Sequence, residues 1–424
     1  MPVTIETEEL VYRNHPADNG AGPLWTYGSP LLARLDSDVL VSTIETDRNV
    51  PGFCNTRWQI RRCTASGWSI WRQGDQADQR EPCPIGAFPD GTIWLSTNPN
   101  ADPRRPKYAR CTPQLLRFSP AGQMQTFQPP WPLDAVFTDH SYRGMAVDPD
   151  AQSVLLLNID AKEGCYHYAL LNDRLEWSAL GILRFPIRAC YPNLAIRGRS
   201  AHVLAIGDIV EPNEAWRAAK HERSGRQWDY VFRRLFYAWT PDIERVPFCE
   251  PLEIDNLDAT CGYLRNGDVY LTDLNAAHLV FYRQSCQYDF IRDRFFPGLP
   301  LERSLEYALV RDGRIAQRRT ILKSDDRSEL IGLGDGPRLH ATPDGHLRLV
   351  ALITHGDSDR PQHHLRLQPL WPQPADPQNI LLTQPIHLFQ TNTPRGGSAA
   401  GLTLDLYGGG NDPQDLVYAR LRLP

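Results

Sequence analysis

The stretch from Cys83 to Thr97 reads CPIGAFPDGTIWLST and contains the pattern that decides the fold. A proline opens it, a short apolar segment follows, Asp90-Gly91 marks a tight turn, and an apolar segment resumes after the turn. An Asp-Gly pair between apolar segments is a strong hairpin signal, because both residues tolerate the backbone angles of a two-residue turn. The stretch therefore predicts two antiparallel strands.

The same pattern recurs along the whole chain, and the copies are separated by 48 to 75 residues. This spacing fits one four-stranded antiparallel sheet with its connections, a unit that repeats around an axis in some all-β folds. Asn266-Gly267 and Asp344-Gly345 predict hairpin turns in two of the later copies. The copies open, in chain order, at Pro30, Pro84, Gly144, Pro192, Gly262, Pro337 and Gly397.

The repeats predict an all-β, single-domain β-propeller over residues 1–424, with seven blades, or six as the alternative. The last copy leaves too few residues for four strands, whereas the strand expected at Val3–Arg13 has no neighbour in sequence. We expect Val3–Arg13 to pair with the C-terminal segment LVYARLRL (Leu416–Leu423). That pairing would close the ring and remove free sheet edges.

Two stretches depart from the strand pattern. Residues 212–225, PNEAWRAAKHERSG, have helical composition and end at a glycine, so they predict a short helix inserted between two strands of the fourth blade. Residues 285–304 are aromatic and charged and predict a long connection that lies on one face. Long connections in compact domains are often functional.

Charge and hydropathy exclude several classes of protein. The chain has 45 Lys+Arg and 50 Asp+Glu, a formal net charge of −5, which argues against a nucleic-acid partner. No apolar run approaches the roughly 20 residues of a membrane span, so we expect no membrane association. The acidic start MPVTIETEEL does not resemble a secretory leader. We expect a cytoplasmic protein, or a secreted or periplasmic one if a leader was removed.

The nine cysteines are scattered and contain no CxxC pair, so we expect free thiols rather than a disulfide framework. The sequence indicates no cofactor, and it leaves a structural calcium or zinc ion open. We expect a monomer.

Candidate site residues lie just before or at the start of each repeat, because the innermost strands of a propeller surround a channel and the preceding segments form a funnel on one face. Arginines that face a cavity require anions, since an unpaired buried charge is costly. The set predicts a carboxylated ligand such as an acidic sugar. It comprises Tyr27, Glu81, Asp139, His140, Ser141, Tyr142, Arg143, Arg188, Tyr191, Thr260, Arg338, His340 and Arg395.

Two of these segments, TDHSYRGMAVD (Thr138–Asp148) and RACYPNLAIRG (Arg188–Gly198), carry a resemblance when taken together with the repeats. The chain resembles BNR-repeat, sialidase-like seven-bladed propellers, and within them the polysaccharide lyases such as ulvan lyases and rhamnose–glucuronate lyases. The resemblance implies β-elimination on a uronate-containing glycan, with a His and a Tyr as acid and base beside an Arg. His140 and Tyr191 match these two residues.

The same chemistry needs a cation that neutralises the uronate carboxylate, and Arg143, Arg188 and Arg338 are candidates. The lyases often have an Arg where this strand ends at Asp208, and a second His for which His167 is the candidate here. The Asp boxes and the N-terminal Arg-Ile-Pro of true sialidases are missing.

Two other functions stay open at this point. Asp208 and Glu211 could form the carboxylate pair of a glycoside hydrolase, or cap the helix expected after them. A non-catalytic propeller that binds a glycan is the third possibility, because fold does not decide function. Further candidates for contact with the ligand are Tyr142, His340, Arg395, Asn55, Arg57 and Arg234.

Overall fold

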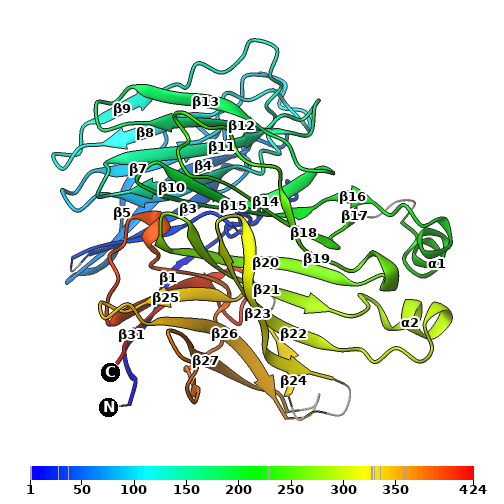
Figure 1. Cartoon of the computed structure of the whole chain (residues 1–424). Coiled ribbons are helices and arrows are strands. Elements are labelled where there is room, and N and C mark those ends of the chain that lie inside the picture. Colours follow the sequence, from blue (N-terminus) through cyan, green and yellow to red (C-terminus); the bar gives the residue numbers. More distant parts are fainter. Residues whose placement is uncertain are drawn as a thin grey trace.

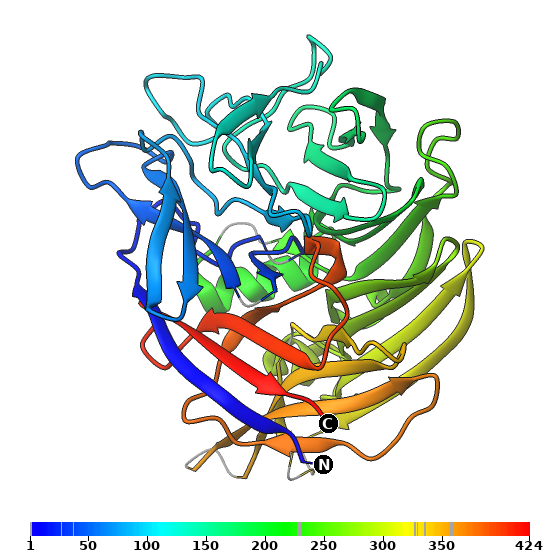
Figure 2. The ribbon, with the colours of Figure 1, turned by 90° about the vertical axis from the view of Figure 1, so that its left-hand side faces the viewer.

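The computed structural model describes residues 2–26, 28–36, 38–226, 230–325, 328, 330–334, 336–356 and 360–424. Seven antiparallel sheets radiate around one axis and form a seven-bladed β-propeller (Figures 1 and 2). The predicted all-β fold with seven blades is confirmed, and the alternative of six blades is wrong.

The first three blades follow the chain without interruption, each with its innermost strand first. Their strands are β2 (Leu32–Leu35), β3 (Asp38–Thr46), β4 (Thr56–Thr64) and β5 (Gly67–Gln73); β6 (Ile85–Ala87), β7 (Ile93–Thr97), β8 (Gln114–Phe118) and β9 (Met124–Phe127); and β10 (Gly144–Asp148), β11 (Ser153–Ile159), β12 (Tyr166–Leu171) and β13 (Trp177–Leu183).

The next three blades carry additions. The fourth has a small β16–β17 ladder and helix α1 between its second and third strands, the fifth has helix α2 in the same place, and in the sixth β24 and β25 both pair with β26. The elements are β14 (Ala189–Arg197), β15 (Ser200–Gly207), β16 (Ile209–Val210), α1 (Glu214–Ser224), β17 (Tyr230–Val231), β18 (Arg234–Thr240), β19 (Leu252–Asn256), η1 (Asp258–Thr260), β20 (Tyr263–Asp273), β21 (Ala276–Gln284), α2 (Asp289–Phe295), β22 (Arg303–Arg311), β23 (Arg314–Ser324), β24 (Leu330–Leu333), β25 (Arg338–Ala341), β26 (Leu347–His355), β27 (Gln362–Trp371) and β28 (Gln378–Ile380).

Both ends of the chain build the seventh blade, which comprises β29 (His387–Thr391), β30 (Thr403–Gly409), β31 (Asp415–Arg422) and the N-terminal β1 (Thr4–Arg13). Strand β1 pairs with β31 over Thr4↔Arg422 to Arg13↔Asp415, as expected from the sequence. In the ring of Figure 2, blue β1 lies beside red β31.

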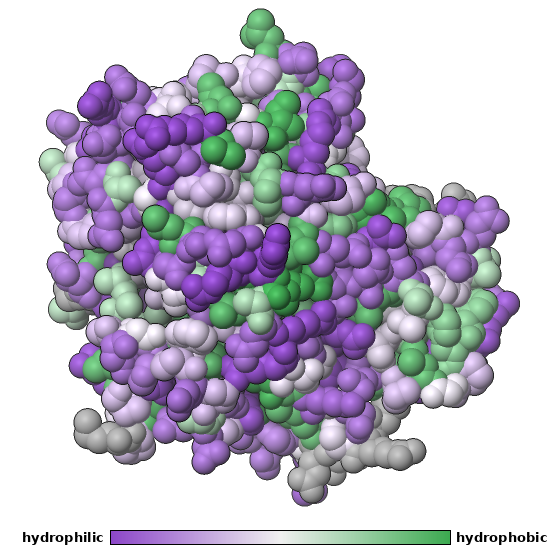
Figure 3. Space-filling view, in the orientation of Figure 1, coloured by the Kyte–Doolittle hydropathy of each residue, from purple (hydrophilic) through white to green (hydrophobic). Residues whose placement is uncertain are grey.

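Each sheet is covered on both faces by its neighbours, so its inner strands read as continuous apolar runs rather than alternating ones. All residues of β10, β11 and β12 are buried, and the largest cluster joins the third, fourth and fifth blades. On the side shown in Figure 3, hydrophilic residues predominate and apolar residues form small groups.

Three details of the sequence-based fold need correction. Asn266-Gly267 is not a turn, because β20 runs through it with a β-bulge between Asn266 and Asp268. The seventh blade does not begin at Gly397: its inner strand is β29, and residues 394–396 form the short helix η2 at the centre of the ring (Figure 2). The connection 285–304 contains α2.

The predicted helix within 212–225 is confirmed as α1. The Asn213 side chain accepts a hydrogen bond from the Trp216 amide at its start, and Gly225 adopts the left-handed conformation at its end. Helices α1 and α2 pack together and project from the same face of the ring, at the right of Figure 1. None of the helices in the described part of the chain is long and apolar enough to cross a membrane.

Candidate functional site

A cavity of about 730 Å³ opens on the face that carries α1 and α2. Its walls come from the ends of β14, β15 and β20 and from two kinds of connection. One kind leads from one blade to the next, such as those with Trp25 and His140, and the other joins second and third strands, such as that with Tyr108. Both kinds emerge at the same face of an antiparallel sheet, so they converge although they lie far apart in sequence.

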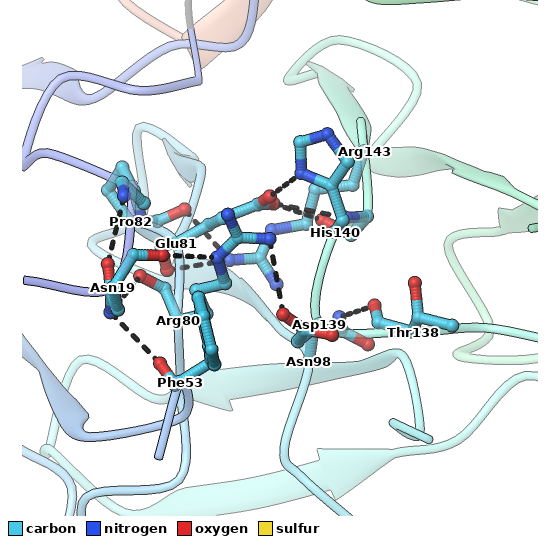
Figure 4. Close-up of polar contacts among 12 residues, drawn as sticks. Asn19, Phe53, Arg80, Glu81, Pro82, Asn98, Thr138, Asp139, His140 and Arg143 are labelled. Atoms are coloured by element: carbon cyan, nitrogen blue, oxygen red, sulfur yellow. Dashed lines mark hydrogen bonds and ion pairs between the residues drawn. The ribbon is translucent and has the colours of Figure 1, made fainter. Parts of the chain in front are cut away.

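His140 is held by a buried carboxylate at one side of this cavity (Figure 4). Its Nδ1 lies 3.0 Å from Glu81 Oε1, and Glu81 Oε2 accepts hydrogen bonds from the Ser141 hydroxyl at 2.6 Å and the Ser141 amide at 3.2 Å. Figure 4 shows the other ring nitrogen of His140 directed away from Glu81. A carboxylate that bonds one imidazole nitrogen fixes the ring and leaves the second nitrogen for chemistry.

The electrostatics of Glu81 follow from this pairing. Burial by itself raises the pKa of the carboxyl, but the hydrogen bond and charge of His140, with the nearby Arg143 and Arg80, outweigh burial and lower the pKa. Glu81 is therefore ionised at neutral pH.

Arg80 lines the cavity beside this pair and is itself fixed (Figure 4). Its Nη1 donates to Asp139 Oδ2 at 3.1 Å, and its Nε donates to the Asn19 carbonyl at 3.0 Å. Burial raises the pKa of Asp139, although the charge of Arg80 opposes the change. The segment that carries His140 is thus anchored at both of its neighbouring residues, Asp139 and Ser141.

Tyr142 and Tyr191 stand next to His140. The ring centroids of His140 and Tyr142 are 4.3 Å apart, and those of Tyr142 and Tyr191 are 4.8 Å apart in an edge-to-face arrangement. Both tyrosines have positive φ, 37° and 51°, a backbone region that bulky residues rarely occupy. Such strain often occurs at functional sites.

Tyr142 keeps its proton at neutral pH. Burial, together with nearby Cys190, Tyr191 and Asp208, raises the pKa of its hydroxyl far above the ordinary value, although Arg188 opposes this change. The hydroxyl is therefore a hydrogen-bond donor at neutral pH.

Asp208 is the one carboxylate among the described residues that line the cavity. It is 1% exposed, and its Oδ2 accepts from Arg188 Nη1 at 2.6 Å. Burial raises the pKa of Asp208, while the charge of Arg188, the hydroxyl of Tyr142 and the charge of His140 reduce this rise. The guanidinium of Arg188 lies 5.2 Å from the centre of the Tyr142 ring, at the edge of the same cluster.

The structure therefore brings together four residues that the sequence singled out, His140, Tyr142, Tyr191 and Asp208, with Arg188 behind them. It places the other predicted arginines elsewhere. Arg143, Arg338 and Arg395 are buried around the central channel and do not line the cavity.

These channel arginines bond to backbone carbonyls. Arg143 donates to the carbonyls of Glu81 and Pro82, Arg338 to those of Phe389 and Gly267, and Arg395 to those of Gly28 and Leu194. An innermost strand has no further strand to pair with on the side of the axis, so its carbonyls need other donors. These three arginines thus have hydrogen-bond partners within the protein, and they hold segments of different blades together at the axis.

The remaining candidates also lie outside the cavity wall. His340 is buried with its Nε2 at the Gly401 carbonyl, and His167 is buried beside Asp160. Asn55 bonds the Ala17 carbonyl, and Arg57 and Arg234 form ion pairs with Asp47 and Asp258. Tyr27 lies outside the described residues. Thr260 belongs to η1, away from the cavity wall.

Sequence reasoning missed several residues of the wall. Trp25 and Arg80 lie in the segments before innermost strands that it did consider, but they were not singled out there. The other residues were missed because they come from connections between second and third strands and from β20, which it did not consider. The long connection between β7 and β8, with its Lys-Tyr pair, was the available signal. The missed residues are Trp25, Arg80, Lys107, Tyr108, Arg226, Tyr230, Phe232, Tyr263 and Arg265.

Within the described part of the chain, no group of three His, Cys, Asp or Glu side chains is placed to hold a metal ion. The arrangement instead offers an oriented imidazole, a protonated tyrosine and several cations around an aromatic cavity.

No family model and no curated protein matches the chain. Solved structures with a similar fold include an α-L-arabinanase from Penicillium chrysogenum in complex with arabinobiose, at 11% identity, with 99% of this chain and 98% of that chain covered and a TM-score of 0.44. The β-propeller domain of the trilobed protease from Pyrococcus furiosus is 9% identical, with 92% and 95% covered and a TM-score of 0.46.

A sialidase from Trypanosoma rangeli with the inhibitor DANA is likewise 9% identical, and the alignment covers 92% of this chain and 54% of that chain with a TM-score of 0.43. These likenesses concern the fold alone and assign no activity to this chain. They include sialidase-type propellers, whereas the likeness to ulvan and rhamnose–glucuronate lyases stays a prediction.

Proposed function

We propose that the protein is a carbohydrate-active enzyme that cleaves an acidic, uronate-containing glycan by β-elimination in this cavity. The observation that carries the proposal is the His140–Glu81 pair beside Tyr142, in a cavity whose described wall has four Lys or Arg side chains and a single carboxylate. An oriented imidazole beside a protonated tyrosine supplies a base and an acid. The excess of cations favours a substrate that carries carboxylates.

The reaction can be written with these residues. Nε2 of His140 takes the proton from C5 of the uronate, the electron pair forms the C4–C5 double bond, and the C4–O4 bond breaks. The Tyr142 hydroxyl gives its proton to the departing O4. Lys107, on the His140 side of the cavity, neutralises the substrate carboxylate and so makes the C5 proton more acidic.

The alternative of a glycoside hydrolase needs two carboxylates at the reacting bond. Asp208 has the raised pKa that suits a proton donor, but Glu211 is not its partner. Glu211 is fully buried and holds Arg233 with both of its oxygens, and it does not line the cavity. Elimination is therefore the reaction that the described side chains support best.

The test is turnover of a panel of uronate polymers, including polygalacturonate, alginate, glucuronan and ulvan. Elimination yields an unsaturated uronate that absorbs in the ultraviolet, whereas hydrolysis yields reducing ends without this absorbance. Carboxyl-reduced polymers should be poor substrates. Reducing ends without absorbance would support the hydrolase, and binding without turnover would support a glycan-binding propeller.

The His140→Ala variant should lose about 100-fold or more in turnover, because the base is gone. The melting temperature should stay nearly unchanged, since the imidazole lies at the cavity wall. His346→Ala is the matched control: this histidine is exposed in the turn between β25 and β26 and should behave like the wild type. Full activity of His140→Ala would remove His140 from the mechanism.

A further inference from the structure

Two histidines lie side by side in the sixth blade, away from the cavity. His355 is the last residue of β26, and His364 lies near the start of β27. His364 pairs with Ile353, two residues before His355, and the ladder is regular over this part of the two strands. Residues two apart in a strand share a face of the sheet. Both imidazoles therefore project from the same face, as diagonal neighbours on adjacent strands.

The two rings are close enough to share one metal ion. The ring centroids of His355 and His364 are 5.7 Å apart, and the ring planes are nearly perpendicular, at 78°. A tetrahedral Zn²⁺ at about 2.0–2.1 Å from one nitrogen of each imidazole places the two ring centres about 5–6 Å apart. The observed spacing is thus the spacing of two imidazole ligands on a single ion.

Each ring also carries a buried nitrogen without a partner. Among the residues that the structure describes, none is within hydrogen-bond reach of His355 Nε2 or His364 Nδ1, although both atoms are shielded from solvent. Their surroundings include fully buried Ile353, and Leu330 lies opposite His355 on β24. Buried polar atoms in proteins nearly always have a partner, and an ion is one of the few groups that explain an exception. A metal ion between the rings accepts the lone pairs of both nitrogens.

A second pair of histidines, on the other face of the same sheet, lacks these features. The ring centroids of His363 and His387 are 6.0 Å apart. His363 Nδ1 lies 3.0 Å from the Thr354 hydroxyl, so this nitrogen has a partner. Within the described part of the chain, neither ring of this pair has a buried nitrogen that lacks one. Ring proximity alone therefore does not distinguish the two pairs, whereas the orphaned nitrogens do.

We propose that His355 and His364 bind one divalent transition-metal ion, such as Zn²⁺, through His355 Nε2 and His364 Nδ1. Two protein ligands leave the other positions of the ion to water. Imidazole nitrogens suit Zn²⁺, Ni²⁺ and Cu²⁺, whereas Mg²⁺ and Ca²⁺ prefer oxygen ligands. The ion joins the end of β26 to β27, and no residue of the sixth blade belongs to the described cavity wall. The metal site is therefore independent of the reaction proposed for the cavity.

Calorimetric titration of the full chain, without a histidine tag, with Zn²⁺ tests the site. We expect one ion per chain and a melting temperature that rises with Zn²⁺, because the ion binds the folded chain. Mg²⁺ should have no comparable effect. His355→Ala and His364→Ala should each weaken Zn²⁺ binding about tenfold or more, since one of the two ligands is gone.

His387→Ala is the matched control, because it removes a ring of the second pair and should bind Zn²⁺ like the wild type. Loss of binding in His387→Ala instead of the other two variants would overturn the proposed site. Zn²⁺ affinities that none of the three variants changes would show an adventitious ion only, and would overturn it as well. Melting curves without metal show whether each variant folds.

Cu²⁺ gives a readout on the wild type alone, which does not depend on how well any variant folds. Electron paramagnetic resonance of the protein with one equivalent of Cu²⁺ should show the hyperfine pattern of two coordinated nitrogens. A pattern of a single nitrogen in the wild type would contradict the shared ion. In the folded His355→Ala and His364→Ala variants, the pattern should fall to one nitrogen. These measurements need no substrate, so failure of the proposed function leaves their outcome unaffected.

Discussion

His140 owes its orientation to Glu81, which lies 59 positions earlier in the chain and belongs to a different connection between blades. The carboxylate is surrounded by donors, since Ser141 supplies both its amide and its hydroxyl. Each of these bonds costs the chain conformational freedom, and together they define a single imidazole position. Glu81 is therefore a positioning residue that acts through His140.

Replacing Glu81 by Gln should lower kcat about tenfold to 100-fold while KM stays nearly constant, because the amide cannot hold His140 as the carboxylate does. Glu81→Asp should recover part of the loss, since a carboxylate is present again. Steady-state kinetics of both variants on the best uronate polymer measure this difference. If Gln and Asp lower kcat equally, Glu81 has only a structural role.

Asp208 makes the folded protein sensitive to pH. Because burial raises its pKa, the folded state binds the proton more tightly than the unfolded state does. Its contribution to stability is thus fully present below the unfolded pKa of about 3.9 and is lost as pH rises through the folded pKa.

Asp208→Asn should therefore gain stability relative to the wild type as pH rises from acid to neutral. Urea unfolding of the two proteins across this range measures the difference, and comparison of the pair cancels other titrating groups such as Asp139. The exposed Asp173→Asn, in the β12–β13 turn, is the control. A constant difference between the two curves would show that Asp208 does not titrate as described.

The innermost strands meet around the axis, and glycines permit the closest approaches. A Cβ on Gly267 would lie 2.6 Å from the Pro337 carbonyl oxygen and 2.8 Å from that of Val280. Both neighbours are backbone atoms that cannot move aside. The glycine that the sequence pattern assigned to a turn thus serves close packing of β20 against the sixth blade.

Gly267→Ala should destabilise the protein by about 1–3 kcal/mol through overpacking. Gly336→Ala is the matched control, because a Cβ at Gly336 meets no atom within 4 Å. Chemical denaturation of the two variants measures the difference. Equal stabilities would mean that β20 and the segment around Pro337 can separate at no cost.

The sequence predicted the strands and hairpins that depend on neighbouring residues. It did not predict contacts between residues that are far apart in the chain and meet only in the folded ring. Asp90-Gly91 identifies the β6–β7 hairpin because a tight turn requires particular residues at adjacent positions. The apolar run of β11 identifies a strand because a sheet that is covered on both faces needs consecutive apolar residues. His140, Tyr142 and Tyr191 were found because they precede or begin inner strands. Tyr108 was not found, since its place in the cavity depends on where the β7–β8 connection folds back in space.

Arg395, at the centre of the ring, is a second residue whose surroundings the sequence did not predict. It precedes an apparent repeat, so the sequence predicts that it faces the funnel. In the structure it belongs to η2 and is buried at the central channel. Its Nη2 donates to Asp268 Oδ1 at 2.6 Å, and Nη1 reaches the carbonyls of Gly28 and Leu194. One side chain from the seventh blade thus holds the segment before the first blade and the inner strands of the fourth and fifth.

Loss of one partner of this central ion pair should be strongly destabilising. Removing Arg395 leaves Asp268, which is 1% exposed, without its counter-charge. Arg395→Met should lower the free energy of unfolding by about 3–5 kcal/mol. The double variant Arg395→Met/Asp268→Asn should be less destabilised than the sum of the single variants, because no uncompensated charge remains.

Arg104→Met is the control for the pair, since Arg104 bonds Asp102 at the surface and its loss should leave the free energy of unfolding nearly unchanged. Urea denaturation gives the free energies, and turnover below the melting transition separates structure from chemistry. Arg395→Met should keep the kcat of the wild type if the arginine joins blades at the axis. If Arg395→Met has unchanged stability but no longer binds or cleaves uronate polymers, Arg395 contacts the substrate, as the sequence predicted.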